Sequence, residues 1–169
     1  MESEVITMSA HCSKLSPLLP IREKQNFGDY LKELYPIYEK EIAEENFTFH
    51  GKPVKVFNEL NFNLQHQTFE HLTTKGDKNR LYNSKRCERL SWIKDILKNV
   101  CSGCGDYRVF PDSKWKKTNR KRYIIWCVKE KYVIVLEERE KEVYIITAYC
   151  LLYKSKEEQL EKEYKKTLK

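Results

Sequence analysis

Three short apolar runs in the C-terminal half constrain the fold of this chain most. Residues 123–128, 132–136 and 143–148 are rich in β-branched and aromatic side chains, and the charged segments 129–131 and 137–142 separate them. Runs of this length joined by short turns predict a three-stranded antiparallel meander. Because the first two runs are apolar on both faces, other parts of the chain must cover the sheet on both sides.

A helix is predicted on the N-terminal side of this sheet in the sequence. Asn83 or Ser84 is a suitable N-cap, and the residues that follow have a helical period. The apolar positions of this helix, 85–100, lie three or four residues apart and form one face: Leu90, Ile93, Ile96, Leu97 and Val100. Trp92 and Ile93 continue the packing face. Arg86 and Arg89 should then stand together near the beginning of the helix.

The N-terminal half completes an α+β pattern. Residues 27–43 carry a helical apolar stripe that Pro36 should kink or break, and residues 47–57 alternate around Gly51, which predicts a short hairpin. Residues 106–110 form a candidate strand ending at Pro111. The predicted fold class is therefore α+β, with N-terminal helices and a central helix packed on an antiparallel sheet that contains the meander 123–149.

The chain is long enough for one domain with tails. We expect a flexible N-terminal arm (1–25), a single domain (26–153), and a charged C-terminal helix or tail (154–169). No apolar run approaches the roughly 18 residues of a membrane span, and the acidic start lacks the features of a signal peptide. A cytoplasmic protein without a membrane partner follows as the expectation; the oligomeric state does not follow from the sequence.

The net charge of +7 is distributed unevenly. Residues 71–131 hold 17 Lys/Arg against 6 Asp/Glu, whereas residues 1–70 hold 7 against 11. Clustered cations are what binding to a polyphosphate backbone requires, so this segment predicts a nucleic-acid surface. The alternative is ordinary solvated surface charge.

The six cysteines are spread over the chain and do not indicate a disulfide scaffold. Only Cys101 and Cys104 have a metal-like spacing, and Cys87 with His71 is the best second pair for zinc. A turn with two reduced thiols is the simpler interpretation. The basic segment also lacks an acidic cluster that could hold Mg²⁺. We therefore expect neither a metal site nor a cofactor.

Residues 69–93 contain the strongest candidate site. Arg86 and Arg89 at a helix N-terminus, with His71 and Lys75 arriving from the preceding loop, would make a phosphate receptor beside a titratable imidazole. The alternative for His71 is a satisfied histidine beneath a loop.

The segment 113–122 is a second candidate, because it interleaves Trp115 with six cations. An aromatic ring can stack on a base while cations follow the backbone, although a flexible solvated loop has the same composition. The predicted RNA-binding residues of the two segments are Lys75, Arg80, Trp115, Lys116, Lys117, Arg120, Lys121 and Arg122.

Four short motifs occur in order along the chain: Phe49-His-Gly-Lys-Pro-Val54, Phe69-Glu-His71, Arg86-Cys-Glu-Arg89-Leu-Ser-Trp92-Ile93 and Ile146-Thr147-Ala148-Tyr149. In this order and spacing, over about residues 45–153, they resemble the barnase/EndoU/colicin/RelE-like ribonuclease superfamily, most closely its phage and prophage branch. The resemblance implies helices against a curved antiparallel sheet, whose concave face cuts RNA without a metal. It places His71, Arg86, Arg89, Thr147 and Tyr149 at that face.

The chemistry of these residues suits such a reaction. Cleavage of RNA through its own 2′-hydroxyl needs a proton acceptor, a proton donor and cations on the phosphorane. His71 suits either proton role, and arginines suit the phosphate. The predicted function is a toxin-like endoribonuclease acting on single-stranded or tRNA-like RNA, and the resemblance leaves room for an inhibitor or antitoxin protein as a partner. Two alternatives stay open: a non-catalytic RNA-binding module, and a regulator that acts through protein contacts of the acidic first 70 residues.

Overall fold

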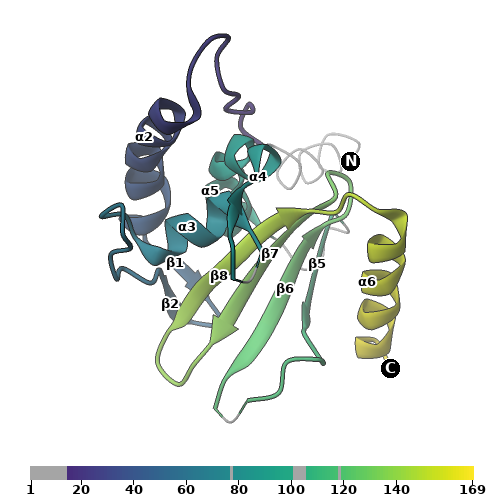
Figure 1. Cartoon of the computed structure of the whole chain (residues 1–169). Helices are drawn as coiled ribbons and strands as arrows, with labels where there is room; N and C mark the ends of the chain where they lie inside the picture. The colour runs from purple at the N-terminus through teal and green to yellow at the C-terminus, as the bar shows by residue number, and fades with distance from the viewer. Residues whose placement is uncertain (1–14, 77, 101–105, 118) are drawn as a thin grey trace, which may run out of the picture.

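A computed structural model confirms the predicted α+β fold (Figure 1). It describes residues 15–76, 78–100, 106–117 and 119–169. The helical elements are α2 (Phe27–Tyr38), the π-helix η1 (Glu39–Ala43), α3 (Gln67–Thr73), α4 (Ser84–Glu88), α5 (Leu90–Asn99) and α6 (Lys154–Thr167). The strands are β1 (Phe47–Phe49), β2 (Lys52–Lys55), β3 (Thr74–Lys75), β4 (Leu81–Tyr82), β5 (Tyr107–Pro111), β6 (Lys121–Cys127), β7 (Tyr132–Glu138) and β8 (Val143–Cys150).

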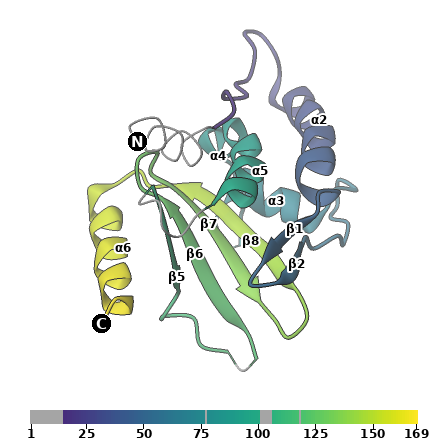
Figure 2. The same cartoon turned by 180° about the vertical axis from the view of Figure 1, so that it is seen from behind.

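The predicted meander forms the centre of a curled six-stranded sheet with the order β1-β2-β8-β7-β6-β5 (Figures 1 and 2). β5 extends it on one side by pairing with β6. On the other side β2 pairs with β8 in parallel, but only over Val54–Val143 and Lys55–Tyr144. The remainder of the β8 edge is therefore not covered by a strand. Helices α3 and α4 lie against it instead.

The main core lies between one face of the sheet and the N-terminal and central helices. β7 contributes Tyr132, Ile134 and Leu136, each at most 1% exposed, because alternate residues of a strand point to the same face. Trp92 of α5 stacks edge-to-face on Tyr132, with the ring centroids 5.4 Å apart. Trp92 and Ile93 are both buried, so their predicted packing role is confirmed.

A smaller core covers part of the opposite face. Leu160 and Tyr164 of the charged helix α6 pack against a set of sheet residues that includes Trp126 and Val133. Figures 1 and 2 show α6 on the β5 side of the sheet, far from the helices of the main core. The part of this face nearer to β8 carries polar and half-buried side chains. The candidate site lies in that part.

The predicted helix 85–100 is divided in two. Its N-cap is Asn83 as predicted, because the Asn83 side chain accepts a hydrogen bond from the Arg86 backbone N–H at 3.0 Å. At Arg89, however, the backbone leaves the helical conformation (φ −104°, ψ 16°), and α5 begins at the next residue. Arg89 consequently lies at the junction of the two helices and not on the helix that carries Arg86, in contrast to the prediction.

The stripe over 27–43 forms one continuous helical segment. Pro36 lies inside α2, and the chain continues as the π-helix η1 up to Ala43. Proline has no N–H to donate, and a local change of helix type is one way in which a helix accommodates such a loss. The buried positions Leu34, Tyr38 and Ile42 keep the predicted core-facing stripe.

The predicted N-terminal arm differs from the structure where it is described. Residues 1–14 of that segment lie outside the described residues. From Leu15 onward the chain is attached to the helices: the Trp92 Nε1–H donates to the Ser16 carbonyl at 2.8 Å, and the Leu19 N–H donates to the Glu88 carbonyl at 2.8 Å. These hydrogen bonds and the packing of Leu15 and Leu19 on the core hold the segment.

The predicted hairpin is β1–β2, joined by His50 and Gly51. Both residues have positive φ, 52° and 76°, as a two-residue type I′ turn requires. Gly51 tolerates this conformation without strain, since it has no Cβ.

Replacing Gly51 with alanine should lower the free energy of unfolding by about 1 kcal/mol, because the left-handed conformation is costly for a residue with a Cβ. The added Cβ would meet no atom within 4 Å, so conformational strain is the only expected cause. Gly28→Ala in α2 is the control and should leave stability unchanged or slightly raised. Urea unfolding of both variants measures the difference, and equal stabilities would contradict the assignment.

Candidate functional site

Two pockets lie along β8. The first, here called the His71 pocket, has a volume of about 260 Å³ and is lined by His71 of α3, Ile146 of β8 and a group of charged and aromatic side chains. The second, here called the Arg86 pocket, has a volume of about 290 Å³ and is lined by Arg86 of α4, Tyr149 of β8 and the chain that follows β8. Both volumes are near the lower end of the range for small-ligand sites.

His71 is positioned by the contact between α3 and the uncovered edge of β8. Its backbone carbonyl accepts hydrogen bonds from the Thr147 hydroxyl and from Arg86 Nη1, each at 3.3 Å. Partial burial lowers the pKa of the imidazole, and the positive charges of Arg80 and Arg86 lower it further. His71 therefore stays neutral to a lower pH than an ordinary histidine, and a neutral imidazole is able to accept a proton.

The charge of the His71 pocket is strongly positive. Its lining contains the cations Lys117, Arg120, Arg122 and Arg139, and Glu137 is the single acid. A pocket with this excess of guanidinium groups is suited to an anion with several oxygens, such as a phosphate.

Glu137 organises these arginines. Its side chain is 2% exposed, which is unusual for a carboxylate unless the charge is paired. Arg122 Nε donates to Oε2 at 3.1 Å, and Arg139 Nε donates to Oε1 at 3.1 Å. Arg139 Nη2 lies 3.0 Å from the same Oε1 in an ion pair. Because Glu137 fixes one edge of each guanidinium, their remaining donors are held in place at the pocket.

Sequence reasoning did not select Glu137 or Arg139, because both fall in the segment 137–142 that was interpreted as a turn. β7 extends through Glu138 and places Glu137 directly opposite Arg122 in the register of the hairpin. The sequence contains a signal for this pairing. If the two strands are extended by equal lengths from their turn, an arginine lies opposite a glutamate.

Trp115 lines the His71 pocket, but as a half-buried ring and not as a freely exposed one. The Arg122 guanidinium lies 3.4 Å from the ring centroid, and Lys117 Nζ lies 5.1 Å from it. The indole N–H is buried and has no hydrogen-bond partner among the described residues. The ring thus packs against two cations of the pocket in a cation–π arrangement.

Arg86 connects the Arg86 pocket to the backbone of His71 and to Thr147. Its Nη1 contacts the Thr74 carbonyl at 2.7 Å, the His71 carbonyl at 3.3 Å and the Thr147 hydroxyl at 3.2 Å. It therefore satisfies carbonyls at the C-terminal end of α3, where a cation is electrostatically favoured. Its guanidinium carbon lies 5.9 Å from the Tyr149 ring centroid. Within the described residues, Nε and Nη2 make no hydrogen bond.

Hydrogen bonds of the His71 carbonyl to Arg86 and Thr147 connect the predicted site residues, but His71 lines one pocket, whereas Arg86 and Tyr149 line the other. Arg89 does not belong to this group. Arg89 Nη1 donates to the Lys85 carbonyl at 3.1 Å, and its guanidinium lies 5.1 Å from the Trp92 ring centroid. It lines neither pocket. The break between α4 and α5 is the physical reason for this separation.

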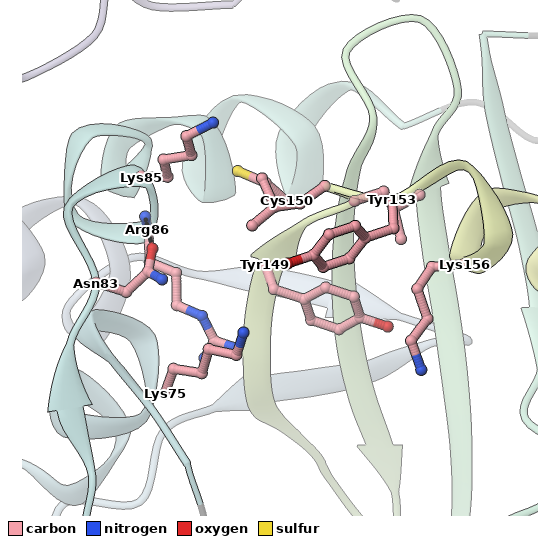
Figure 3. Close-up of a pocket in the computed structure, with 10 residues that line it drawn as sticks. Lys75, Asn83, Lys85, Arg86, Tyr149, Cys150, Tyr153 and Lys156 are labelled. Carbon is pink, nitrogen blue, oxygen red and sulfur yellow. Dashed lines mark hydrogen bonds between the residues drawn. The ribbon is translucent and has the colours of Figure 1, made fainter.

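The predicted RNA-binding residues are divided among three places. Trp115, Lys117, Arg120 and Arg122 line the His71 pocket, whereas Lys75 lines the Arg86 pocket (Figure 3). Lys121 lines a third hollow beside Lys52, which also includes Arg120 and Glu138. Lys116 is exposed and lines none of these three pockets. Arg80 holds the β3–β4 hairpin, because its Nε donates to the Thr74 hydroxyl at 2.7 Å and its Nη2 to the Thr74 carbonyl at 3.1 Å.

No group of three or more His, Cys, Asp or Glu side chains suited to a metal ion occurs in the part of the chain that the structure describes. Cys101 and Cys104, on which the zinc alternative depends, lie outside that part. Cys87 is buried and its thiol donates to the Thr73 carbonyl. Among the described helices, none combines the length and hydropathy that crossing a bilayer requires.

Comparison of the chain with protein-family models, curated proteins and solved structures gave no match. The resemblance to the ribonuclease superfamily therefore stays a prediction, and the argument for function depends on the geometry of the two pockets.

Replacing Arg86 with methionine should lower the free energy of unfolding by about 1–3 kcal/mol, because the end of α3 loses hydrogen bonds from a charged donor. Arg89→Met is the matched control. It removes one exposed hydrogen bond and should cost less than about 1 kcal/mol. Chemical denaturation of the two variants makes the comparison, and a larger loss in Arg89→Met would refute the capping role of Arg86.

The lowered pKa of His71 also predicts a pH dependence of stability. Below about pH 6.5 the unfolded chain binds a proton at this imidazole that the folded chain does not yet bind. Stability should therefore fall as the pH is lowered through 6.5, until the lower folded-state pKa is passed. Unfolding midpoints between pH 7.5 and 5 should decrease less in His71→Gln than in the wild type. Identical pH profiles would show that His71 has an ordinary pKa.

Proposed function

We propose that this protein is a metal-independent endoribonuclease and that the His71 pocket is its reaction centre. The observation that carries the proposal is the composition of this pocket, in which a half-buried imidazole lies with three arginines, two of which a buried glutamate orients. Such a pocket fits a substrate that carries an anionic group next to a hydroxyl that can lose its proton. A phosphodiester flanked by a 2′-hydroxyl is one of this kind.

The reaction needs one proton shuttle and a set of cations. Neutral His71 takes the proton of the 2′-hydroxyl, and the 2′-oxygen forms a bond to phosphorus. The bond from phosphorus to the 5′-oxygen then breaks, and the imidazolium of His71 returns the proton to that leaving oxygen. The products are a 2′,3′-cyclic phosphate and a free 5′-hydroxyl, so no water or metal ion is consumed.

Arg122 and Arg139 have the role that was assigned to Arg86 and Arg89 on the sequence. Their donors, oriented by Glu137, face the position where negative charge grows on the phosphorane oxygens. Glu137 is a positioning residue in this proposal, since its oxygens are occupied by the arginines. Trp115, held against Arg122, offers one face of the pocket to a base.

Cleavage of single-stranded RNA should persist in EDTA and leave 2′,3′-cyclic phosphate ends. His71→Ala should lower kcat by about 100-fold or more, the usual scale for a positioned proton-transfer group. Arg122→Lys should also be impaired, because it keeps the charge but loses the fork that binds two oxygens. His50→Ala is the control: His50 is an exposed histidine of the β1–β2 turn outside the pocket, and this variant should keep full activity.

All variants are compared at equal folded fraction, measured by circular dichroism. Loss of cleavage in EDTA, 5′-phosphate ends, or full activity of His71→Ala would refute the mechanism. A wild-type protein that binds RNA with a steep salt dependence but does not cleave it would favour the non-catalytic RNA-binding alternative. Absence of any RNA binding would favour a regulator that acts through protein contacts.

A further inference from the structure

The reaction proposed above does not use the Arg86 pocket, whose lining combines cations with aromatic and apolar groups. Lys75, Lys85, Arg86 and Lys156 contribute positive charge, and none of the described residues that line the pocket is Asp or Glu. Tyr149 and Tyr153 lie in the middle, with Lys75, Lys85 and Arg86 on one side of them and Lys156 on the other (Figure 3). The matching ligand is an anion attached to a planar apolar body.

Arg86 is pre-organised for such an anion. Three acceptors at the end of α3 and on β8 fix its Nη1, and the guanidinium is half-buried. Its Nε and Nη2 have no partner among the described residues, and Figure 3 shows the Lys75 amine beside the guanidinium. A donor group that is already immobilised loses little entropy when it binds a phosphate.

Tyr153 is suited to the planar part of the ligand. Its side chain is exposed (64%), although it lines a pocket, whereas the neighbouring Tyr149 packs on the smaller core. An exposed tyrosine beside fixed cations is the arrangement on which proteins stack the bases of single-stranded nucleic acids.

The distance between the pockets agrees with a single strand. Ile146 lines the His71 pocket and Tyr149 lines the Arg86 pocket, three residues further along β8. At roughly 3.3 Å per strand residue these two residues are about 10 Å apart. One strand of a double helix advances about 3.4 Å per nucleotide along its axis, so this distance corresponds to about three nucleotides at that helical spacing. Thr147 lies between the pockets and contacts both the His71 carbonyl and Arg86.

We propose that the Arg86 pocket is a second nucleotide subsite, which binds a nucleotide of the same RNA strand about three positions from the cleaved phosphate. Arg86 and Lys75 hold the phosphate of that nucleotide, and its base lies on Tyr153. The inference depends on the proposed ribonuclease function for the identity of the strand. It defines the substrate as single-stranded RNA of at least four nucleotides, because a dinucleotide cannot reach both pockets.

The test measures binding of 2′-fluoro oligonucleotides of two to six nucleotides, which have no attacking 2′-hydroxyl, by fluorescence polarisation on the full chain. Affinity should rise between two and five nucleotides and then level off. Tyr153→Ala should weaken binding of the hexamer about tenfold and leave binding of the dinucleotide unchanged. Lys162→Ala, on the exposed side of α6, is the control and should bind both probes like the wild type.

The possible outcomes separate the subsite from the catalytic proposal. An affinity that does not depend on length, or an equal effect of Tyr153→Ala on both probes, overturns the subsite even if RNA is cleaved. A length dependence that Tyr153→Ala abolishes, in a protein that cleaves no RNA, supports the subsite and refutes the proposed reaction. Failure of the wild type to bind any of these probes overturns the subsite.

Discussion

The burial of β7 on both faces is the constraint on which the rest of the structure depends. Tyr132, Ile134 and Leu136 point into the main core, and Val133 and Val135 point into the smaller one. A strand of this kind is stable only if two separate layers cover it. Helices from the first 100 residues supply one layer, and the C-terminal helix α6 supplies the other. The charged α6 therefore has a structural role through its few apolar side chains.

The candidate site begins where this apolar cover ends. Every second side chain of β7 points to the α6 face, and these are, in order, Val133, Val135 and Glu137. The third of these positions therefore carries a charge. Burying an isolated carboxylate costs several kcal/mol, and arginines on two sides offset that cost here. Replacing such a cluster by apolar residues would serve stability equally well in many proteins. The capacity to bind an anion therefore explains the guanidinium groups at the wall of this pocket better than stability does.

Local patterns predicted those parts of the fold that depend on near neighbours in the sequence. The meander, the β1–β2 hairpin, the Asn83 cap and the α6 helix all follow from alternation, turn residues or helical period. The division of the helix at Arg89 did not, because the apolar spacing from Leu90 onward is the same with or without a break before it. The parallel pairing of β2 with β8 joins residues almost 90 positions apart, and no local signal specifies it.

The site was predicted in part for the same reason. His71, Arg86, Thr147 and Tyr149 were selected from short motifs. In the structure they lie along β8, with His71 at one pocket and Arg86 and Tyr149 at the other. Glu137 and Arg139 were missed because their role depends on the length of β7, which decides whether they belong to a turn or to the sheet. His71 was expected on a loop but lies on α3. It lines one pocket, and its backbone carbonyl accepts a hydrogen bond from Arg86, which lines the other.

Ion pairs in the structure change the interpretation of the uneven charge distribution along the chain. Several cations of the basic segment 71–131 are neutralised away from the pockets: Lys98 pairs with Glu45, and Arg108 and Lys114 pair with Glu161 and Glu163 of α6. The acidic residues of α6 thus reduce the positive field on the β5 side of the sheet. Among the described residues that line the two pockets, cations outnumber acids, so the local charge there is positive. A diffusing polyanion would be directed there by the arrangement of the acids as much as by the bases themselves.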